Sequence, residues 1–491
     1  MMSMLEKKNN STLIMVAIFI ATFMTSIEAT IVTTALPTII SELKGLSMQS
    51  WVFSAYLLTS AISTPIYGKL ADTIGRKKIF LGGIILFCLG SFLCGIAPNI
   101  QSLIIFRAIQ GLGTGAIMPI TFTIIADLFS YEKRSSKIAF NNTAWGISAL
   151  FGPLVGGFIV EKLNWHWIFF INLPLGLIVA LIILFSYQEI TKVKSEFKID
   201  YRGIVLLSIT LLLVLLLFQA LGTNIKIGEI VIFALAIIIF SYFFIKTEYH
   251  VMDPIIPLDI FKNRTFTIQI VTALVLSGVQ MAYQIYFPIW LQSVYSLSPS
   301  MAGLAITPSS IMWLVGSFFV GMLITKYAPR TIIMPLIIIQ ALCYLPLVFA
   351  ATQFPQIFFY IIAATNGLIM GVIITTNTVI SQRLVPKENL GTASSMFTLG
   401  RTLGQTIMTS VFGLVFNAST QSQLKQYSDV SINQISNDIS TVTKGTINGH
   451  LSSEINQIII NNMHSIFMIV ILLFVIVFIA NYLDNKKSIV E

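Results

Sequence analysis

The sequence predicts an all-α integral membrane protein, and three observations lead to that fold class. Of 491 residues, 56% are hydrophobic and 10% are charged, and the mean hydropathy is +0.87. A soluble chain carries about a quarter charged residues, so this chain needs lipid as its solvent. Apolar stretches of about 20 residues, long enough to cross a bilayer as helices, recur along the chain. Lys and Arg stand in short runs between these stretches, which argues against nucleic-acid binding despite a net charge of +9.

The apolar stretches predict fourteen transmembrane helices. Each must be helical because an unpaired backbone polar group in lipid costs several kcal/mol. The first stretch is too long for the core of a signal peptide and is therefore predicted to be the first span. All three cysteines lie inside apolar stretches and imply no disulfide framework. The predicted spans cover residues 13–36, 51–70, 79–97, 101–126, 138–160, 166–187, 203–221, 228–246, 266–291, 302–325, 331–351, 356–380, 393–416 and 464–483.

Positive charges predict the orientation of these spans. Of the 29 Lys and Arg residues, 22 fall in segments on the side of the N-terminus, 5 fall on the opposite side, and Arg107 and Arg401 lie within spans. Because Lys and Arg collect on the cytoplasmic side, both ends of the chain are predicted to be cytoplasmic. High usage of Asn, Lys and Ile favours an AT-rich bacterial genome, and hence a multi-pass protein of a bacterial plasma membrane.

Three pairs of similar segments lie 253 to 256 residues apart and indicate an internal repeat. We expect a six-helix bundle that occurs twice, with the seventh and eighth spans inserted between the copies. Repeats of this kind place the substrate path at their interface, near the bilayer midplane. Chance matching of glycine-rich helices is the alternative. The paired segments are Gly68–Asp72 with Gly321–Thr325, Gln110-Gly111 with Asn366-Gly367, and Gly146 with Gly400.

The repeat predicts three parts. The N-terminal six-helix bundle takes residues 1–187, two inserted transmembrane helices with a cytoplasmic loop take 188–250, and the C-terminal six-helix bundle takes 251–491. The last part includes a polar outer loop over 418–463, in which four apolar residues recur near helical spacing. That spacing favours a hairpin or an interfacial helix, although a linker fits the composition equally well. The four residues are Ile432, Ile435, Ile439 and Val442.

Five short motifs fall at fixed places along the predicted spans. They are Thr30-Ile-Val-x2-Ala35-Leu36-Pro37 at the end of the first span, Gly68-Lys-Leu-Ala-Asp72-Thr-Ile-Gly75-Arg76-Lys77-Lys78 after the second, Leu103-x3-Arg107-x2-Gln110-Gly111-x-Gly113 in the fourth, Gly146-x5-Gly152-Pro153-x2-Gly156-Gly157 in the fifth, and Trp165-x-Trp167-Ile-Phe-x-Ile-Asn172-x-Pro174 at the start of the sixth. In this order and on these helices they resemble the fourteen-span drug:proton antiporters of the major facilitator superfamily, the EmrB/QacA type. The resemblance covers essentially the whole chain.

The resemblance implies a major facilitator fold, with two six-helix bundles plus two inserted central helices. It implies a secondary active transporter that exports amphiphilic drugs or toxic compounds in exchange for protons by alternating access. The expected partners are small amphiphilic substrates, protons and the lipid bilayer. The proton gradient takes the place of a cofactor, no metal is expected, and the protein is expected to work as a monomer.

The resemblance implies a functional role for two of the five motifs, the one after the second span and the one in the fifth span. The motif after the second span implies a cytoplasmic gate, in which an acid–base cluster latches the two halves together. Positive-inside topology with an incidental acid is the alternative. In the second half Thr325 stands in the acid position, so any latch there is weaker. The predicted gate residues are Gly68, Asp72, Gly75, Arg76 and Lys77.

The motif in the fifth span is the antiporter motif of the resemblance, which is typical of exporters. Its small residues let a neighbouring backbone approach closely, and Pro153 is expected to kink the helix. Ordinary packing of small residues is the alternative. The motif residues are Gly146, Gly152, Pro153, Gly156 and Gly157.

Two charges lie deep within the predicted spans at similar depths. Glu28 stands roughly 10 Å below the outer end of the first span, and Arg107 roughly 9 Å below that of the fourth, at 1.5 Å per residue. Because a lone buried charge costs about 2.5–3.5 kcal/mol, we expect the two to pair across the central cavity. Glu28 occupies the place where the family usually has Asp. We expect Glu28 to carry the coupling proton and Arg107 to tune it, the alternative being a static ion pair.

Substrate contacts are expected from polar and aromatic residues of the spans. No acid lies in the tenth or thirteenth span, which disfavours divalent cationic dyes and favours monovalent cations, zwitterions or neutral amphiphiles. Arg401 in the thirteenth span could equally face a lipid headgroup or backbone carbonyls. A wide apolar pocket with few polar anchors binds many shapes. The candidate contacts are Tyr56, Asn141, Trp145, Gln280, Tyr283, Gln284, Trp313, Asn366 and Arg401.

Other functions fit the sequence less well. An exporter or flippase of an endogenous lipid or metabolite remains an alternative, because the sequence does not name the substrate. A membrane-embedded enzyme needs clustered ligands or catalytic groups, yet the four histidines are scattered over loops and span edges. A pump driven by ATP needs a phosphate-binding loop, and no G-x4-G-K-[ST] is present. The sequence therefore predicts a transporter and not an enzyme.

Overall fold

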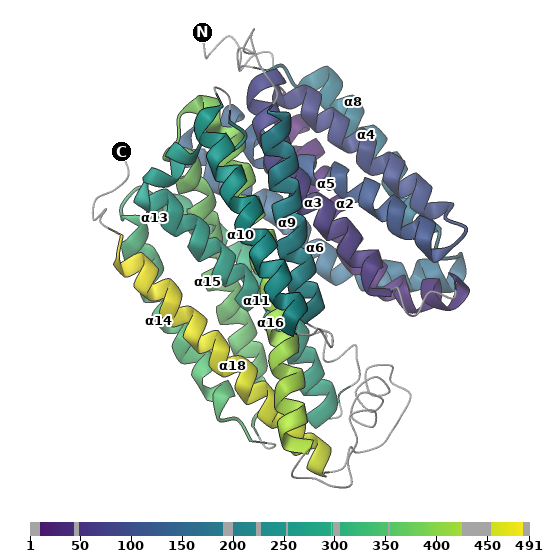
Figure 1. The fold of residues 1–491 in the computed structure, drawn as a ribbon, viewed down its shortest axis with the longest axis vertical. Coiled ribbons are helices and arrows are strands. Elements are labelled where there is room, and N and C mark those ends of the chain that lie inside the picture. Colours follow the sequence, from purple (N-terminus) through teal and green to yellow (C-terminus); the bar gives the residue numbers. More distant parts are fainter. Residues whose placement is uncertain are drawn as a thin grey trace. The chain divides into compact units, whose positions relative to one another are not determined.

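Long apolar helices make up the part of the chain that the computed structural model describes (Figure 1). That part comprises residues 10–43, 49–189, 200–221, 227–251, 254–295, 297, 305–351, 354–424 and 453–484, and it contains no strand. The helices are α2 (Ser11–Leu43), α3 (Gln49–Ile74), α4 (Arg76–Gly95), α5 (Ile100–Leu128), α6 (Tyr131–Lys162), α7 (Trp167–Phe170), α8 (Asn172–Ser186), α9 (Tyr201–Leu221), α10 (Ile227–His250), η2 (Leu258–Lys262), α11 (Arg264–Tyr295), α13 (Thr307–Ile324), α14 (Pro329–Tyr344), η3 (Leu345–Val348), α15 (Ile357–Arg383), η4 (Lys387–Asn389), α16 (Leu390–Leu424) and α18 (Ser453–Tyr482).

Each predicted span overlaps one of these helices. Within the described residues, eleven helices are long and apolar enough to cross a membrane. Three more, α3, α6 and α16, are long enough at 26, 32 and 35 residues but are richer in polar residues. On α6, for example, Asn141 and Ser148 hydrogen-bond to side chains of α2. The all-α membrane architecture is therefore confirmed, and the count of fourteen spans stays a prediction.

The predicted outer loop over 418–463 is too long. Helix α16 continues to Leu424 and α18 begins at Ser453, so both ends of the predicted loop are helical. Polar side chains there bond from helix to helix: Asn461 Nδ2 donates to Gln423 Oε1 at 2.8 Å, and Asn462 Nδ2 donates to Thr420 Oγ1 at 2.7 Å. Polarity therefore misled the prediction, since these side chains stabilise helix packing. The apolar residues predicted to form a hairpin, between 432 and 442, lie outside the described residues.

The chain divides into two compact units. Unit 1 comprises Met1–Val214, Ile232–Phe266 and Thr378–Leu399, and unit 2 comprises Leu215–Val231, Thr267–Asn377 and Gly400–Glu491. The end of α15 and the start of α16 thus group with unit 1. The boundaries predicted for the two bundles and the inserted helices stay a prediction.

Glycines bring the helices of unit 1 into close contact. Helix α5 packs against α3 and α4, and α2 packs against α6 and α8. A Cβ atom on Gly111 of α5 would collide with the backbone of Tyr56 on α3, and one on Gly90 of α4 would collide with the backbone of Gln110 on α5. These helices can approach so closely because no side chain separates their backbones.

The same kind of contact recurs in unit 2. A Cβ atom on Gly367 of α15 would collide with the backbone of Ser309 on α13, and Gly371 faces the backbone of Trp313 one turn further along. The core of this unit is aromatic, with the Trp290 and Phe287 rings of α11 packed against Phe359 of α15. The pairing of Gly111 with Gly367 in the sequence therefore corresponds to the same local packing in each unit.

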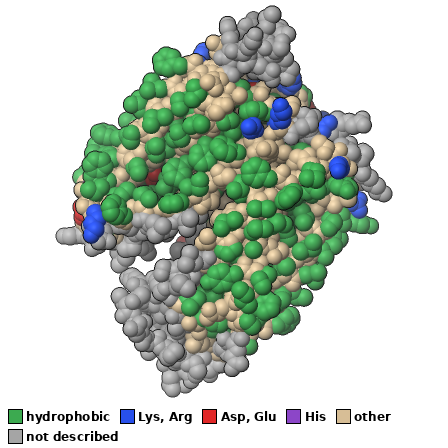
Figure 2. Space-filling view, turned by 180° about the vertical axis from the view of Figure 1, so that it is seen from behind, with side chains coloured by type: hydrophobic (Ala, Val, Ile, Leu, Met, Phe, Trp, Pro, Cys, Tyr) green, Lys and Arg blue, Asp and Glu red, His purple; other side chains and the backbone are tan. Residues whose placement is uncertain are grey.

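The outward surface of the helices is apolar. Figure 2 shows hydrophobic side chains over much of the visible surface. Ile227 at 81%, Phe185 at 77% and Ile232 at 68% exposure, for example, lie on long helices and not at a folded core. A soluble protein does not expose apolar surface on this scale, so these faces require lipid.

Candidate functional site

A buried ion pair joins α2 and α5 in unit 1. Arg107 Nη1 lies 2.5 Å from Glu28 Oε1, and both side chains are fully buried. The same Nη1 donates to Gln110 Oε1 at 2.7 Å, and Arg107 Nε donates to the carbonyl of Val52 on α3 at 3.0 Å. Gln110 is one turn from Arg107 on the same helix, which is why the two side chains meet.

The second oxygen of Glu28 is also held. Asn172, the first residue of α8, donates through Nδ2 to Glu28 Oε2 at 2.8 Å and to Ser91 Oγ of α4 at 3.0 Å. Gln110 Nε2 donates to the same Ser91 hydroxyl at 3.2 Å. Glu28 thus accepts from two different helices, and side chains of α4 and α5 close the network through one shared hydroxyl.

An aromatic ring covers the guanidinium of Arg107. The Tyr56 ring of α3 lies with its centroid 4.3 Å from Arg107 Cζ, a cation–π contact. Thr114 Oγ1 fixes that ring by donating to the Tyr56 hydroxyl at 2.9 Å. Arg107 Nη2 has no hydrogen-bond partner among the described residues, so the ring is its neighbour in place of an acceptor.

The position of the pair differs from the expectation. The sequence predicts that Glu28 and Arg107 pair across the central cavity. The two side chains do pair, but they lie enclosed among five helices of unit 1 and are inaccessible to solvent. The reason is that Gln110 accepts from Arg107, Asn172 donates to Glu28, and Ser91 accepts from both amides, so the ion pair has polar partners inside the unit. Sequence reasoning placed Gln110 and Asn172 in motifs but gave neither of them a role.

A second polar cluster lies where α3 meets α4. Gly75 joins the two helices with φ = 110°, a conformation that favours glycine. Arg76 is buried beside two acids: Nη1 lies 2.5 Å from Asp127 Oδ2 of α5, and Nη2 lies 3.3 Å from Asp72 Oδ1. Its backbone N–H donates to the Glu189 carboxylate. The predicted gate residues Asp72, Gly75 and Arg76 are thus brought together.

The Asp72 carboxylate caps the beginning of α16, which belongs to the same unit. The backbone N–H groups of Gly391 and Thr392 donate to its two oxygens at 2.9 and 2.8 Å, and Thr392 Oγ1 adds a bond of 3.2 Å. An acid at a helix N-terminus satisfies free N–H groups and complements the helix dipole. Gly68 permits this approach, because a Cβ there would collide with the Ser395 side chain.

Lys77 has a different partner from the other gate residues. Its Nζ donates to the carbonyls of Leu184 and Tyr187, both at 2.7 Å, and so caps the end of α8. Tyr187, just beyond α8, donates its hydroxyl to Asp127 Oδ2 at 3.4 Å. Burial, with the nearby Asp127 carboxylate, raises the pKa of the Tyr187 phenol well above its usual value, so the phenol remains a donor.

Sequence reasoning missed several residues of this cluster. Asp127, Glu189, Gly391 and Thr392 all bind predicted gate residues, yet none belongs to the gate motif. A usable signal existed for the last two, since Asn389, a residue type that favours the N-cap, stands directly before the start of α16. Asp127 and Glu189 stand in no recognisable pattern, and only the tertiary structure brings them to Arg76.

The antiporter motif lies on α6, opposite α2. A Cβ on Gly152 would collide with the Thr30 side chain, and Thr30 Oγ1 donates to the carbonyl of Ser148 at 3.1 Å. Gly156 is buried and Gly146 is half-buried. Close packing of α6 on α2 is thus built on these small residues. The burial of Pro153 and of Gly157 is not described, so the expected kink stays a prediction.

The candidate substrate residues do not form one cluster. Tyr56 covers Arg107, and Asn141 accepts from Thr22 at 3.1 Å, so both serve packing inside unit 1. Tyr283 donates to the carbonyl of Ile306 at 3.1 Å. Trp145 and Gln284 are exposed, and Trp313 is half-buried. Their role in substrate binding stays a prediction.

Gln280 and Asn366 belong to a buried network in unit 2. Asn366 Nδ2 donates to Gln280 Oε1 at 3.1 Å, and Asn366 Oδ1 accepts from Gln340 at 2.8 Å and from the Tyr344 hydroxyl at 2.9 Å. Asn366 is the repeat partner of Gln110, and Gln280 follows Glu28 by a similar offset of 252 residues. Unit 2 therefore holds neutral amides where unit 1 holds an ion pair.

Arg401 is the intramembrane cation of unit 2. Its Nε atom is buried and has no hydrogen-bond partner among the described residues. No Asp or Glu occurs in the sequence between Asp259 and Glu388 or between Glu388 and Asp429, so α11, α13, α14, α15 and α16 offer it no acid.

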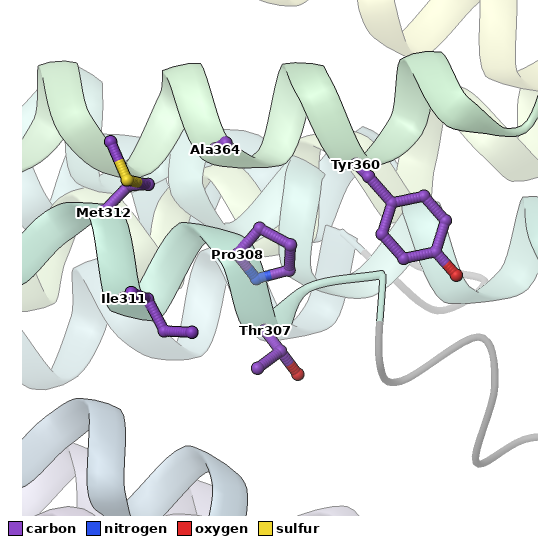
Figure 3. A pocket seen from close by; sticks show the side chains of 6 residues that line it. All are labelled: Thr307, Pro308, Ile311, Met312, Tyr360 and Ala364. Atoms are coloured by element: carbon purple, nitrogen blue, oxygen red, sulfur yellow. The ribbon is translucent and has the colours of Figure 1, made fainter.

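A shallow apolar pocket opens between α13 and α15 of unit 2 (Figure 3). Thr307, Pro308, Ile311 and Met312 line it from α13, and Tyr360 and Ala364 line it from α15. None of the candidate substrate residues lines this pocket. In the described part of the chain, no three His, Cys, Asp or Glu residues form a group that could hold a metal ion.

Comparison with known proteins agrees with this architecture. The family model described as Major Facilitator Superfamily matches residues 18–409. The chain is 34% identical to the multidrug transporter protein MdtP of Bacillus subtilis, over 85% of this chain and 77% of that protein. It is 30% identical to the multidrug export protein EmrB of Escherichia coli K12, over 81% of this chain and 78% of that protein.

Solved structures show the same fold at much lower identity. The human organic anion transporter MFSD10 (TETRAN) aligns with a TM-score of 0.63 and 12% identity, over 95% of this chain and 99% of that one. The proton:xylose symporter XylE aligns with a TM-score of 0.62 and 13% identity, over 94% of each chain. The family resemblance and the fold predicted from the five motifs are thus confirmed, and the chain belongs to the Major Facilitator Superfamily.

Proposed function

We propose that this protein exports amphiphilic drugs or other toxic compounds in exchange for protons, by alternating access. Its family consists of membrane transporters, which argues against an enzyme, and relatives at 30–34% identity are named multidrug transport or export proteins. The observation that carries the proton exchange is the Glu28 carboxylate, which is fully buried within a membrane helix and ion-paired to Arg107. Ionisable residues at such depth are costly and are normally functional.

Glu28 is the proposed proton carrier. While it is ionised, Arg107 and Asn172 satisfy its two oxygens. Protonation removes the charge that Arg107 neutralises, and the guanidinium then keeps only Gln110, the Val52 carbonyl and the Tyr56 ring. The two protonation states therefore favour different arrangements of α2, α5 and α8, and a proton shifts the balance between two conformations.

The Asp72 cluster is the proposed cytoplasmic gate. Asp72 and Arg76 tie the junction of α3 and α4 to the beginning of α16, through bonds to backbone groups of Lys387, Gly391 and Thr392. Charge-assisted bonds of this kind are individually strong but depend on geometry. A rotation of α3 relative to α16 breaks all of them together, so the cluster can stabilise one conformation and release the other.

Arg401 is the proposed anchor for an anionic group of the substrate. Arg401 Nε is buried without a hydrogen-bond partner among the described residues, and α11, α13, α14, α15 and α16 carry no acid, so a negative group brought from outside satisfies it best. Substrates that carry a carboxylate, including zwitterions, then bind more tightly than their esters. We also propose a bacterial plasma membrane, cytoplasmic termini and a functional monomer.

Transport in proteoliposomes tests the proton exchange. Glu28→Gln keeps the size and the hydrogen-bonding capacity of the side chain but cannot ionise. We expect a fluorescent amphiphilic cation to leave wild-type vesicles with matching proton movement, recorded by a pH dye inside, and we expect a protonophore to abolish uphill export. The Glu28→Gln variant should lose proton movement coupled to substrate.

The matched control is Glu229→Gln, which removes an exposed acid at the start of α10. This variant should transport like the wild type. Substrate-dependent proton movement at the normal rate in Glu28→Gln would show that another group carries the proton. Glu28→Asp, which restores the usual residue of the family, should retain coupling.

A further inference from the structure

Two acids meet where α9 begins and α10 ends. Asp200 directly precedes α9, and Glu248 lies in the last turn of α10. Both belong to unit 1, and they are only 8% and 4% exposed. Acids this buried normally have a counter-ion or a full set of hydrogen bonds. Neither belongs to the Glu28 network or to the Asp72 cluster.

Each carboxyl group has one satisfied oxygen and one unsatisfied oxygen. Asp200 Oδ1 accepts from the Gly203 N–H at 2.9 Å and so caps α9, and Glu248 Oε2 accepts from the Ile256 N–H at 2.9 Å. Asp200 Oδ2 and Glu248 Oε1 are buried and have no hydrogen-bond partner in the described residues. Half of each carboxyl group therefore lacks a donor.

The two unsatisfied oxygens face the same point. A Cβ atom built on Gly203 would lie 2.6 Å from Glu248 Oε1 and would collide with Asp200 Oδ2. Both oxygens border the space beside Gly203, where one carboxyl group can donate to the other if it carries a proton. Gly203 is thus the residue that leaves room for the second acid beside the first.

Charge repulsion favours the same proton. Ionisation of both acids would place two carboxylate oxygens facing each other in a buried site. Like charges at this distance are strongly unfavourable in a low dielectric. A single proton removes this repulsion and supplies the missing donor. Lys69 of α3, itself only 9% exposed, is a cation whose charge acts on Glu248 and opposes its protonation.

We propose that Asp200 and Glu248 form a proton-binding site that is separate from Glu28. The bound proton holds the start of α9 and the end of α10 together beside α3. With the proton bound, the two carboxyl groups attract each other, and without it they repel. Lys69 is three residues from Asp72 on α3, so the site adjoins the cluster that caps α16. The inserted helices thereby acquire a contact whose strength depends on pH.

Amide variants mimic the proton-bound state. Asn at position 200 remains a good cap for α9, and its N–H₂ group can donate to Glu248. In the same way, Gln at position 248 keeps an acceptor for the Ile256 N–H and offers a donor to Asp200. Asp200→Asn and Glu248→Gln therefore keep the backbone contacts and remove only the requirement for a proton.

Thermal unfolding of the full-length protein in detergent, followed from about pH 5 to about pH 9, tests the proposal. The folded state binds this proton more tightly than the unfolded state, so it contributes stability at low pH that is lost as the pH rises. We expect the wild-type Tm to fall by at least about 2 °C more than that of Asp200→Asn or Glu248→Gln over this range. Glu229→Gln, an exposed acid of the same helix, should follow the wild type.

Lys69→Gln gives an independent readout. Removal of the cation strengthens proton binding by the acid pair, so the pH at which stability falls should move upward. A merely structural role for Lys69 would lower the Tm without moving that pH. Protection against hydrogen exchange, corrected for the intrinsic rise of amide exchange with pH, should fall with pH at residues 200–204 and 246–250 in the wild type and stay level in either amide variant.

Three results would overturn the proposal. The first is a wild-type profile that coincides with those of both amide variants. The second is a gain of stability at high pH on addition of Na⁺ or Mg²⁺ alone, which would show that a metal cation occupies the site. The third is a Lys69→Gln profile that does not move. If one amide variant does not fold, the other carries the test. None of these measurements requires transport, so they stand even if the proposed function fails.

Discussion

At the scale of single residues, neutral side chains supply most of the hydrogen bonds around the Glu28–Arg107 ion pair. Gln110 accepts from Arg107 and donates to Ser91, and Asn172 donates to both Glu28 and Ser91. A buried ion pair with incomplete bonding loses more from desolvation than it gains from attraction. The amides therefore determine whether the pair can exist at this depth, and they are as important to the proposed coupling as the charges.

Arg401 leads to a prediction about substrate charge. Arg401→Gln removes the proposed anchor, and a hydrogen bond to a charged group is worth about 1.5–3 kcal/mol. We expect the export rate of a rhodamine dye with a free carboxyl group to fall by about tenfold or more at subsaturating concentration, as such an energy implies. Export of the ethyl ester of the same dye should change much less. Arg401→Lys, which retains charge without the planar fork, should lie between the two.

The comparison of the two dyes distinguishes binding from folding. A variant that is misfolded or poorly inserted exports neither dye. An equal loss for the acid and the ester would contradict a role in recognising the carboxylate.

At the scale of elements, the helices meet through glycines and through helix ends. Asp72 illustrates the second kind of contact, because one carboxylate accepts from the first two free N–H groups of α16. The Gly367 contact illustrates the first kind, because it leaves no space between the backbones of α15 and α13. Both contacts predict large effects from small substitutions.

Asp72→Asn should loosen the beginning of α16. The amide keeps one acceptor oxygen but loses the charge that complements the helix dipole, a loss of about 0.3–2 kcal/mol. We expect amide hydrogen exchange at residues 390–393 to accelerate by about 2- to 30-fold, the factor that this energy implies. Asp259→Asn, at an exposed acid, should leave exchange unchanged. Unchanged exchange in Asp72→Asn would mean that the carboxylate does not hold the helix.

Gly367→Ala should destabilise unit 2. The added methyl group collides with the backbone of Ser309, which cannot move away as a flexible side chain could. Overpacking of this kind typically costs about 1–3 kcal/mol. The melting temperature in detergent measures the effect. Gly413→Ala, where a Cβ meets nothing within 4 Å, is the control and should be neutral. Equal melting temperatures for the two variants would contradict the close approach.

At the scale of the whole molecule, the sequence predicts helices and family well but predicts partners poorly. Apolar length is a local property, so each predicted span falls on a helix. Motif order along the chain is also readable, and the family it indicated is confirmed. In contrast, Asp127 and Glu189 reach Arg76 only through tertiary packing, over 51 and 113 residues. The enclosure of Glu28 was likewise unpredictable, because it depends on Ser91, a residue without any pattern.

The two units also show what repetition leaves unspecified. Asn366 and Gln280 occupy places like those of Gln110 and Glu28, yet their network contains no charge. A weak sequence repeat predicted where polar side chains gather and could not predict their ionisation. The polar ends of α16 and α18 make the same point, since residues predicted as a loop continue the helices.

The complete enclosure of Glu28 has a consequence for a membrane that contains idle copies of this protein. A proton cannot bind to a carboxylate that is inaccessible to water, so binding requires the surrounding helices to separate. Without cargo, the protein should therefore be no more permeable to H⁺ than plain lipid. The ion gradient on which the cell depends for other work would then stay intact between transport cycles.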